Sequence, residues 1–232
     1  MPRQSRIVAP DLPHHVTQRG NRRAPIFFEP GDQGGYLELL ARETRRREVE
    51  VWAYCLMPNH VHLILTPRTP GGLGLAVGEA HRRYTNFVNA RAGWTGHLFQ
   101  SRFASVAMDE AHLMAAVRYV SLNPVRARLA TRARDWPWSS VRAHLAGEVD
   151  VLVKVRPVLD RQPRFADLID ARNDDDPQLF RALRLAEMSG RPAGAADFVA
   201  ALERRLGRTI TPRPRGRPAK TTAAPTGDLF AG

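Results

Sequence analysis

Two strand-like segments joined by a two-residue turn constrain the fold of this chain more than any other feature. Residues Val49–Met57 (VEVWAYCLM) are rich in β-branched and aromatic side chains, Pro58–Asn59 is a turn signal, and His60–Thr66 (HVHLILT) has the composition of a second strand. So short a link favours an antiparallel hairpin. Alternate side chains of a strand share a face, so His60 and His62 point one way and the apolar residues between them point the other. We therefore expect a core face on one side and two neighbouring histidines on the other.

The rest of the sequence predicts further strands and helices around this hairpin. The expected elements are a strand at His14–Arg19, helices near Asp32–Arg47 and Leu75–Ala90, a strand at Phe103–Met108, a helix from Asp109 or Glu110 to about Leu122 that Asn123–Pro124 stops, and a short closing helix within Trp136–Gly147. Two later helices, one starting near Asp174–Asp176 and one at Ala195–Leu206, suit either a helix-turn-helix or a simple αα-hairpin. We expect an α+β fold with a mostly antiparallel sheet over residues 1–148. A small helical region at 149–208 and a disordered Arg/Pro/Gly-rich tail at 209–232 follow.

The charge of the chain indicates a polyanionic partner. Thirty-five Lys and Arg residues against 23 Asp and Glu give a net charge of +12, and Lys154 and Lys220 are the only lysines. The planar guanidinium of arginine suits phosphate. A single cysteine, Cys55, excludes an internal disulfide framework and any multi-cysteine zinc or iron–sulfur site. Because we find no apolar signal segment and no apolar run of membrane-spanning length, we expect a bacterial cytoplasmic, nucleoid-associated protein with no membrane partner.

The histidine pair is a candidate metal site. Two histidines two apart on a strand stand close enough to share an ion, although the spacing equally suits histidines that only form hydrogen bonds. Tyr119 lies in the helix expected at Glu110–Leu122, and Asn123 follows that helix directly. The two residues are four apart, so they share one helical face. An asparagine carbonyl oxygen is a hard ligand and favours Mg²⁺ or Mn²⁺. His60, His62 and Asn123 would leave positions open for water or a substrate phosphate, as a catalytic divalent metal requires.

Tyr119 is the candidate nucleophile of such a site. A phenol attacks poorly until a metal or a neighbouring group activates it or its target. One turn from a metal ligand, the Tyr119 oxygen could attack a phosphorus held by that metal. The alternative is a half-buried core tyrosine, and Tyr84, which follows Arg82 and Arg83, is the competing nucleophile.

Several longer motifs resemble those of the single-tyrosine HUH transposases, and most closely the branch associated with repetitive extragenic palindromes (REPs). The two strongest are YCLMPNHVHLILTP at Tyr54–Pro67 and RYVSLNPVRARL at Arg118–Leu129. Three more agree in the family's order: HHVTQRGNRRAPIF at His14–Phe27, HRRYTNFVN at His81–Asn89 and GHLFQSRF at Gly96–Phe103. The resemblance therefore covers about Pro10 to His144.

The resemblance implies a ferredoxin-like HUH core that nicks single-stranded DNA. In such an enzyme His60 and His62 would be metal ligands and Asn123 the third, amide-type ligand. Tyr119 would attack the scissile phosphate, form a 5′-phosphotyrosine and release a 3′-OH, and strand transfer would reverse this attack. Because a phosphotyrosine conserves the bond energy, no nucleotide cofactor is needed. The family places its nucleophile on the later helix, so we prefer Tyr119 to Tyr84.

Other residues are candidates for contact with DNA. Arg19, Arg22 and Arg23 follow the first strand, where the family reads DNA next to its hairpin, and Arg82 and Arg83 suit phosphate contact. Gln100 and Arg102 lie in an aromatic and basic segment suited to stacking and phosphate contacts. Arg215 and Arg217 belong to an RGRP sequence that resembles the core of an AT-hook, whose arginines enter a narrow minor groove; non-specific attraction to phosphate is the alternative.

The sequence thus predicts a transposase-like enzyme. Its expected activity is metal-dependent nicking and strand transfer of single-stranded DNA at hairpin or palindromic repeats, as in DNA transposition and recombination. The alternative is a DNA-binding regulator or architectural protein that keeps the fold without catalysis, and a relaxase or rolling-circle initiator would use the same chemistry. A pure binder has no physical need for the histidines, the tyrosine and the asparagine together, which favours the enzyme. We expect a monomer or a homodimer, with the active site completed in cis or in trans.

Overall fold

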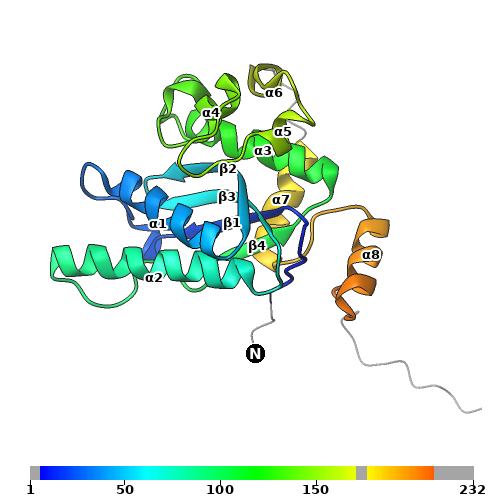
Figure 1. Cartoon of the computed structure of the whole chain (residues 1–232), viewed down its shortest axis with the longest axis horizontal. Coiled ribbons are helices and arrows are strands. Elements are labelled where there is room, and N and C mark those ends of the chain that lie inside the picture. Colours follow the sequence, from blue (N-terminus) through cyan, green and yellow to red (C-terminus); the bar gives the residue numbers. More distant parts are fainter. Residues whose placement is uncertain (1–5, 171–176, 212–232) are drawn as a thin grey trace, which may run out of the picture.

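A four-stranded antiparallel sheet forms the centre of the molecule (Figure 1). The computed structural model describes residues 6–170 and 177–211. The elements that build the sheet and cover its first face are β1 (His14–Arg19), α1 (Asp32–Arg46), β2 (Val49–Met57), β3 (His60–Pro67), α2 (Gly72–Ala92) and β4 (Ala104–Ala107). The strand order is β2-β3-β1-β4, and every neighbouring pair is antiparallel. This βαββαβ order confirms the expected α+β fold and its ferredoxin-like core.

The expected hairpin is present and its register fixes which side chains share a face. Met57 pairs with His60 across the Pro58–Asn59 turn. A register shift between Val51 and Ala53 marks a β-bulge in β2. Bulges add a residue to one strand and change the alternation of its side chains. Accordingly Val51 packs in the cluster beneath α1 and α2, whereas Trp52 and Ala53 both pack in the cluster on the other face.

Helices α1 and α2 cover the face of the sheet that carries the apolar residues of β3. Val61, Leu63 and Leu65 are fully buried there, together with Tyr36 of α1 and Tyr84 of α2. Burying a Leu- or Val-sized side chain contributes about 1.5–3 kcal/mol, so a strand that lays three of them on one face is held firmly in register. The opposite face of β3, which carries His60 and His62, is thereby directed away from α1 and α2.

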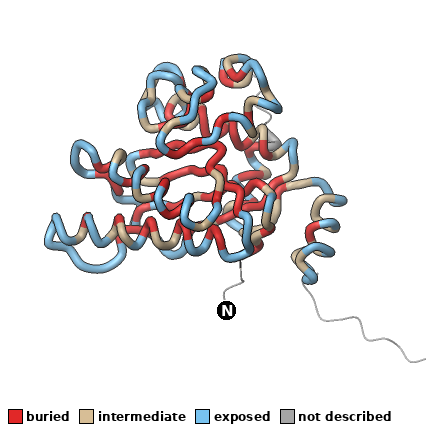
Figure 2. The backbone as a smooth tube through the Cα atoms, viewed as in Figure 1, coloured by how far each residue is buried: buried red, intermediate tan, exposed pale blue. Residues whose placement is uncertain are grey.

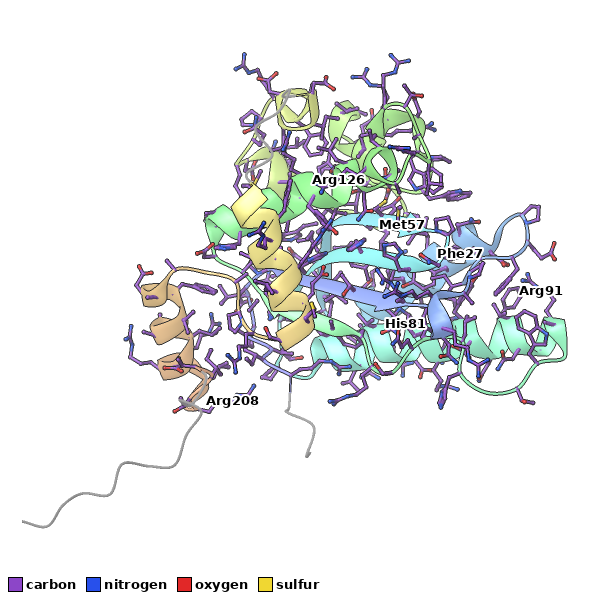
Figure 3. All side chains as sticks on the ribbon, turned by 180° about the vertical axis from the view of Figure 1, so that it is seen from behind. Phe27, Met57, His81, Arg91, Arg126 and Arg208 are labelled. Atoms are coloured by element: carbon purple, nitrogen blue, oxygen red, sulfur yellow. The ribbon has the colours of Figure 1, made fainter. Side chains whose placement is uncertain are left out.

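The other face of the sheet is covered by α3 (Glu110–Arg126) and α7 (Pro177–Ser189). Figure 3, seen from behind, shows α7 lying across this face. The expectation that Asn123–Pro124 stops the α3 helix is wrong, because the helix continues through buried Pro124 to Arg126. A proline inside a helix lacks the N–H that would bond to the preceding turn and crowds the carbonyl four residues earlier, but its own carbonyl can still accept a hydrogen bond. The carbonyls of Asn123 and Pro124 accept hydrogen bonds from Ala127 N (2.9 Å) and Leu129 N (2.8 Å), so the last turn closes normally.

The chain beyond residue 126 packs back onto the same core. Its elements are η2 (Ala133–Asp135), α4 (Val141–Ala146), α5 (Arg156–Leu159), α6 (Phe165–Asp170), α7 and α8 (Ala196–Leu206); a single turn, η1 (Asn21–Arg23), follows β1. Val153 is buried in the cluster under α1 and α2, and Phe165 and Leu183 in the cluster under α3. The red buried strands in Figure 2 are enclosed on both sides. The predicted boundary near residue 148 is therefore not a break in packing.

The two helices compared with a helix-turn-helix have separate environments. Leu183 of α7 packs in the α3 cluster, whereas Leu202 of α8 packs with Ile7, Ala9 and Ala107 at the edge of the sheet. This is not the mutual packing of a helix pair. The acidic residues Asp174–Asp176, expected to start α7, and most of the predicted tail lie outside the described residues. No helix in the part of the chain that the structure describes is long and apolar enough to cross a membrane.

Candidate active site

An open pocket of about 440 Å³ lies where β1 and β3 meet α7 and the segment before β4. In the antiparallel register Thr17 stands opposite His62, and Arg19 stands opposite His60. Directly paired residues of two strands share a face, so β1 adds its own side chains to the histidine face of β3. The residues that line the pocket are Thr17, Gln18, Arg19, His60, His62, Gln100, Ser101, Arg102, Ala104, Glu187 and Met188.

The two predicted histidines are neighbours and both are held at Nδ1. Their ring centroids are 4.9 Å apart. His60 Nδ1 lies 2.6 Å from the Asn59 Oδ1 acceptor, and His62 Nδ1 lies 3.0 Å from His15 Nε2. Burial lowers the pKa of His60 to about 4, with a smaller contribution from Arg19, and lowers that of His62 well below the usual histidine value. Both rings are therefore neutral near pH 7, which is the form that binds a metal ion.

Two further groups, neither of them predicted from the sequence, stand beside this pair. His15 of β1 is fully buried and Glu187 of α7 is partly buried; His15 Nδ1 is 3.1 Å from Glu187 Oε1. The alignment of these two atoms is poor, and neither has a hydrogen-bond partner among the described residues. Burial lowers the pKa of His15 to about 4 and raises that of Glu187 to about 7. His15, His62 and Glu187 each offer an atom within 4.8 Å of the others, so they form a second possible metal-binding set.

Tyr119 of α3 lies against His62 and His15. Its ring centroid is 5.5 Å from that of His62 and 6.2 Å from that of His15, in edge-on contacts. The residue is 8% exposed, and Phe180 of α7 packs 5.5 Å from its ring. The Arg126 guanidinium lies 5.5 Å from the Tyr119 centroid. Within the described residues the hydroxyl of Tyr119 has no hydrogen bond.

Asn123 follows one turn after Tyr119 because α3 does not end at that point. Its Nδ2 is buried and has no hydrogen-bond partner in the described part of the chain. A buried amide left unpaired costs about 1–3 kcal/mol, which indicates that a group other than the described residues satisfies it. Rotation of the amide by half a turn exchanges Nδ2 for Oδ1, the atom that ligates a hard cation. The donor set of two neutral imidazoles and an unpaired amide therefore fits a divalent metal ion.

Tyr84, the competing tyrosine, lies on the opposite face of the sheet. It is 1% exposed in the cluster under α1 and α2, and its hydroxyl donates a 2.8 Å hydrogen bond to the Ile26 carbonyl. Burial raises the pKa of this phenol far above its usual value. The structure therefore brings Tyr119, and not Tyr84, to the histidine pair.

The candidate DNA-contacting residues fall into separate groups. Arg19, Gln100 and Arg102 line the pocket, whereas Arg22 and Arg23 are exposed on η1, both with positive φ (55° and 61°). Arg82 and Arg83 lie on α2, away from the pocket, and contact Glu79 at 2.7 and 2.6 Å. Arg215 and Arg217 lie outside the described residues.

The pocket continues into a second cavity of about 330 Å³. The two share Ser101, Arg102, Ala104, Glu187 and Met188, and the residues that line only the second include Arg6 and Phe103. The Arg6 guanidinium stacks 3.6 Å from the Phe103 ring centroid. Phe103 is buried in the core, so Arg6, and not the aromatic ring, is the group of this pair that could contact a phosphate in the cavity.

Comparisons with known proteins bear on the family and the fold of the chain. Residues 9–123 match a family model described as "Transposase IS200 like". Among solved structures, a REP-associated tyrosine transposase bound to a REP hairpin is 21% identical with a TM-score of 0.51, over 65% of this chain and 90% of that chain. A candidate transposase from Deinococcus radiodurans R1 is 20% identical, with a TM-score of 0.36 over 55% of this chain and 92% of the other. A search of curated proteins gives no match. The first likeness supports the fold, and the second is too distant to carry an argument.

Proposed function

The chain belongs, through residues 9–123, to the IS200-like transposase family, and from this premise we propose that it is a metal-dependent nuclease and strand transferase for single-stranded DNA. Its substrate class is DNA that folds into hairpins at palindromic repeats. The observation that carries the proposal is the placement of the Tyr119 ring against His62, beside a pocket lined by arginines. A protein that only binds DNA does not require a tyrosine beside two neutral histidines and an unpaired amide.

In this proposal Tyr119 is the nucleophile that attacks the scissile phosphate. The Tyr119 oxygen forms a bond to the scissile phosphorus while the bond from phosphorus to the 3′ oxygen breaks. The phenol loses its proton, and the released 3′ oxygen gains one. The products are a 5′-phosphotyrosine and a free 3′-OH, and attack by another 3′-OH reverses the step and joins the strands.

His60, His62 and Asn123 would hold the divalent metal, Mg²⁺ or Mn²⁺. When bound, such an ion polarises the scissile phosphate and neutralises the charge that develops on it. Neutral imidazoles are ready to bind without first losing a proton. Arg19 and Arg102 would position the phosphates of the strand at the pocket, and Arg6 would contact a phosphate beyond it.

The central test is formation of a covalent adduct. We expect that the protein, mixed with Mg²⁺ or Mn²⁺ and a labelled hairpin oligonucleotide, gives a protein–DNA adduct that survives denaturing electrophoresis. Tyr119→Phe should abolish the adduct, and Tyr84→Phe should keep it. Loss of the adduct in Tyr84→Phe with retention in Tyr119→Phe would reverse the assignment. Tight, metal-independent binding with no adduct on any hairpin would instead support a non-catalytic DNA-binding protein.

A second test separates the pocket arginines from those on α2. Arg19→Ala should weaken hairpin binding at all salt concentrations and reduce the slope of log K against log salt by about 1, because it removes one phosphate contact. Arg82 is equally exposed but lies on the far helix and contacts Glu79, so Arg82→Ala should have the smaller effect. Fluorescence anisotropy over a salt series measures both. An equal loss in the two variants would mean that DNA crosses both faces of the protein.

A further inference from the structure

Three side chains form a continuous row beside the proposed metal site. Glu187 Oε1 is 3.1 Å from His15 Nδ1, and His15 Nε2 is 3.0 Å from His62 Nδ1. The two imidazole rings are close to coplanar, with 18° between their planes. His15 is fully buried and His62 is 3% exposed, so water has little access to the contact between the two rings, whereas Glu187 is partly exposed at the pocket. Each residue comes from a different element, and Glu187 comes from α7, beyond the residues that match the family.

The contact between the two histidines holds a single proton. In a pair of neutral rings, one nitrogen donates and the other accepts. If His62 Nδ1 carries the proton, His62 Nε2 keeps its lone pair and can bind a metal. If His15 Nε2 carries it, His62 Nδ1 accepts the hydrogen bond and His62 Nε2 holds the other proton. In that second state neither nitrogen of His62 is available to a metal.

The position of the same proton also determines whether His15 can bind a metal. With the proton on His15 Nε2, His15 Nδ1 would be free to bind a metal together with Glu187. While the hydrogen bond between the rings is kept, His15 and His62 therefore cannot both be ligands. His15, His62 and Glu187 therefore do not form one three-ligand site. Either His62 binds a metal, or His15 binds one together with Glu187.

The Glu187 carboxylate favours the state in which His62 binds. Burial raises the pKa of Glu187 to about 7, so the carboxyl is ionised above that pH. An ionised oxygen 3.1 Å from His15 Nδ1 attracts a proton on that nitrogen, whereas an unprotonated nitrogen would set two lone pairs against each other. With the proton on Nδ1, His15 Nε2 must accept from His62 Nδ1. A small rotation of the carboxyl would complete the first bond. His60 reaches the same state independently, because the Asn59 Oδ1 acceptor requires its proton on Nδ1.

We propose that Glu187 and His15 form a relay that fixes the tautomer of His62 and so presents its Nε2 to the metal ion. They are positioning residues and not ligands. Partners of this kind commonly orient metal-binding histidines. The inference rests on the proposed metal site of His60 and His62, and it gives helix α7 a role in that site within one chain.

The test measures metal binding by the full-length protein without DNA. Glu187→Ala should raise the Kd for Mn²⁺, followed by the EPR signal of the free ion, by about 10–100-fold. Glu187→Gln should restore most of the affinity, because an amide oxygen still accepts from His15 Nδ1. Side-chain ¹⁵N NMR of the metal-free protein should show His62 protonated at Nδ1 in the wild type and a mixture of tautomers in Glu187→Ala. Leu185→Ala, an exposed position on the same helix, is the control and should match the wild type.

Three results would overturn the relay. The first is an unchanged Mn²⁺ affinity in a folded Glu187→Ala protein, and the second is an unchanged ¹⁵N spectrum of His62 in that variant. The third is a thiolate-to-metal charge-transfer band in Glu187→Cys loaded with Co²⁺, which would make position 187 a direct ligand. These readouts need no DNA cleavage. A protein that shows the relay but forms no adduct would contradict the proposed function alone.

Discussion

At the scale of single residues, the two tyrosines differ in what their hydroxyl groups do for the fold. The Tyr84 hydroxyl donates to the Ile26 carbonyl inside the core, whereas the Tyr119 hydroxyl has no hydrogen bond within the described residues. Tyr84→Phe should therefore lower the free energy of unfolding by about 1 kcal/mol, because it leaves a buried carbonyl unpaired. Tyr119→Phe should change it by less than about 0.5 kcal/mol. Urea unfolding measures both, and a larger loss in Tyr119→Phe would show that its hydroxyl has a structural partner.

The candidate site was predictable from sequence wherever it depends on local spacing. The alternation of β3 predicts that His60 and His62 share a face, and helical spacing predicts that Tyr119 and Asn123 do. His15 and Glu187 depend on strand register and on the docking of α7, which local spacing does not encode. The available signal for His15 was the same alternation in β1, because His15 and Arg19 share a face of that strand. For Glu187, one glutamate in an amphipathic helix, we find no signal in the sequence.

At the scale of elements, the sequence predicts each strand and helix of the sheet layer, and its errors concern ends and junctions. The proline at position 124 gave the wrong end for α3 because tertiary packing outweighs the loss of one hydrogen bond. The bulge at Val51/Ala53 has no sequence marker, although it decides which face receives Trp52. Such junctions depend on how two layers meet, and so on contacts that are distant in sequence.

The junction between α1 and α2 gives a test at this scale. Arg91 near the end of α2 forms two hydrogen bonds with Asp32 at the start of α1, and Asp32 also accepts from the Phe28 and Glu29 amides. The pKa of Asp32 is lowered to about 2, first through the Arg91 hydrogen bond. Arg91→Ala leaves a 3%-exposed carboxylate without its cation and should lower the urea midpoint clearly.

Arg82→Ala on the same helix is the matched control for that junction. Its partner Glu79 is more exposed than Asp32, so the midpoint should stay close to that of the wild type. Equal urea midpoints for Arg91→Ala and Arg82→Ala would contradict the view that the Arg91–Asp32 pair stabilises the packing of α1 against α2.

At the scale of the whole molecule, the charge of +12 is distributed over more than one surface. Arg19 and Arg102 line the proposed nicking pocket, and Arg82 and Arg83 lie on the far helix. Composition alone could indicate a polyanion but could not assign these positions. Residues 149–208 were expected to form a small helical accessory region. Within it, Val153 packs under α1 and α2 and Leu183 packs under α3, so these residues contribute to both clusters of the core.

Buried neutral histidines should make the whole fold sensitive to acid. His81 of α2 is enclosed by Tyr36, whose hydroxyl is 2.9 Å from His81 Nε2, and by the stacked ring of Phe99. Burial, with a smaller effect of Arg6, lowers its pKa to about 3. An unfolded histidine takes up a proton near pH 6.5, so between about pH 6.5 and pH 3 the unfolded state binds one more proton than the folded state at this position. The contribution of His81 to the free energy of unfolding is therefore full above about pH 6.5, and it falls as the pH decreases from there towards pH 3.

His81→Gln isolates this contribution. In the wild type the free energy of unfolding should fall with decreasing pH, and His81 should account for about 1.4 kcal/mol per pH unit between about pH 6 and pH 4. The variant should be less stable at pH 7, because it loses the stacking on Phe99, yet its stability should depend less steeply on pH by that amount. Urea titrations at a series of pH values measure the two slopes. Because the other buried histidines titrate equally in both proteins, parallel slopes would mean that His81 is protonated in the folded state or does not titrate on unfolding.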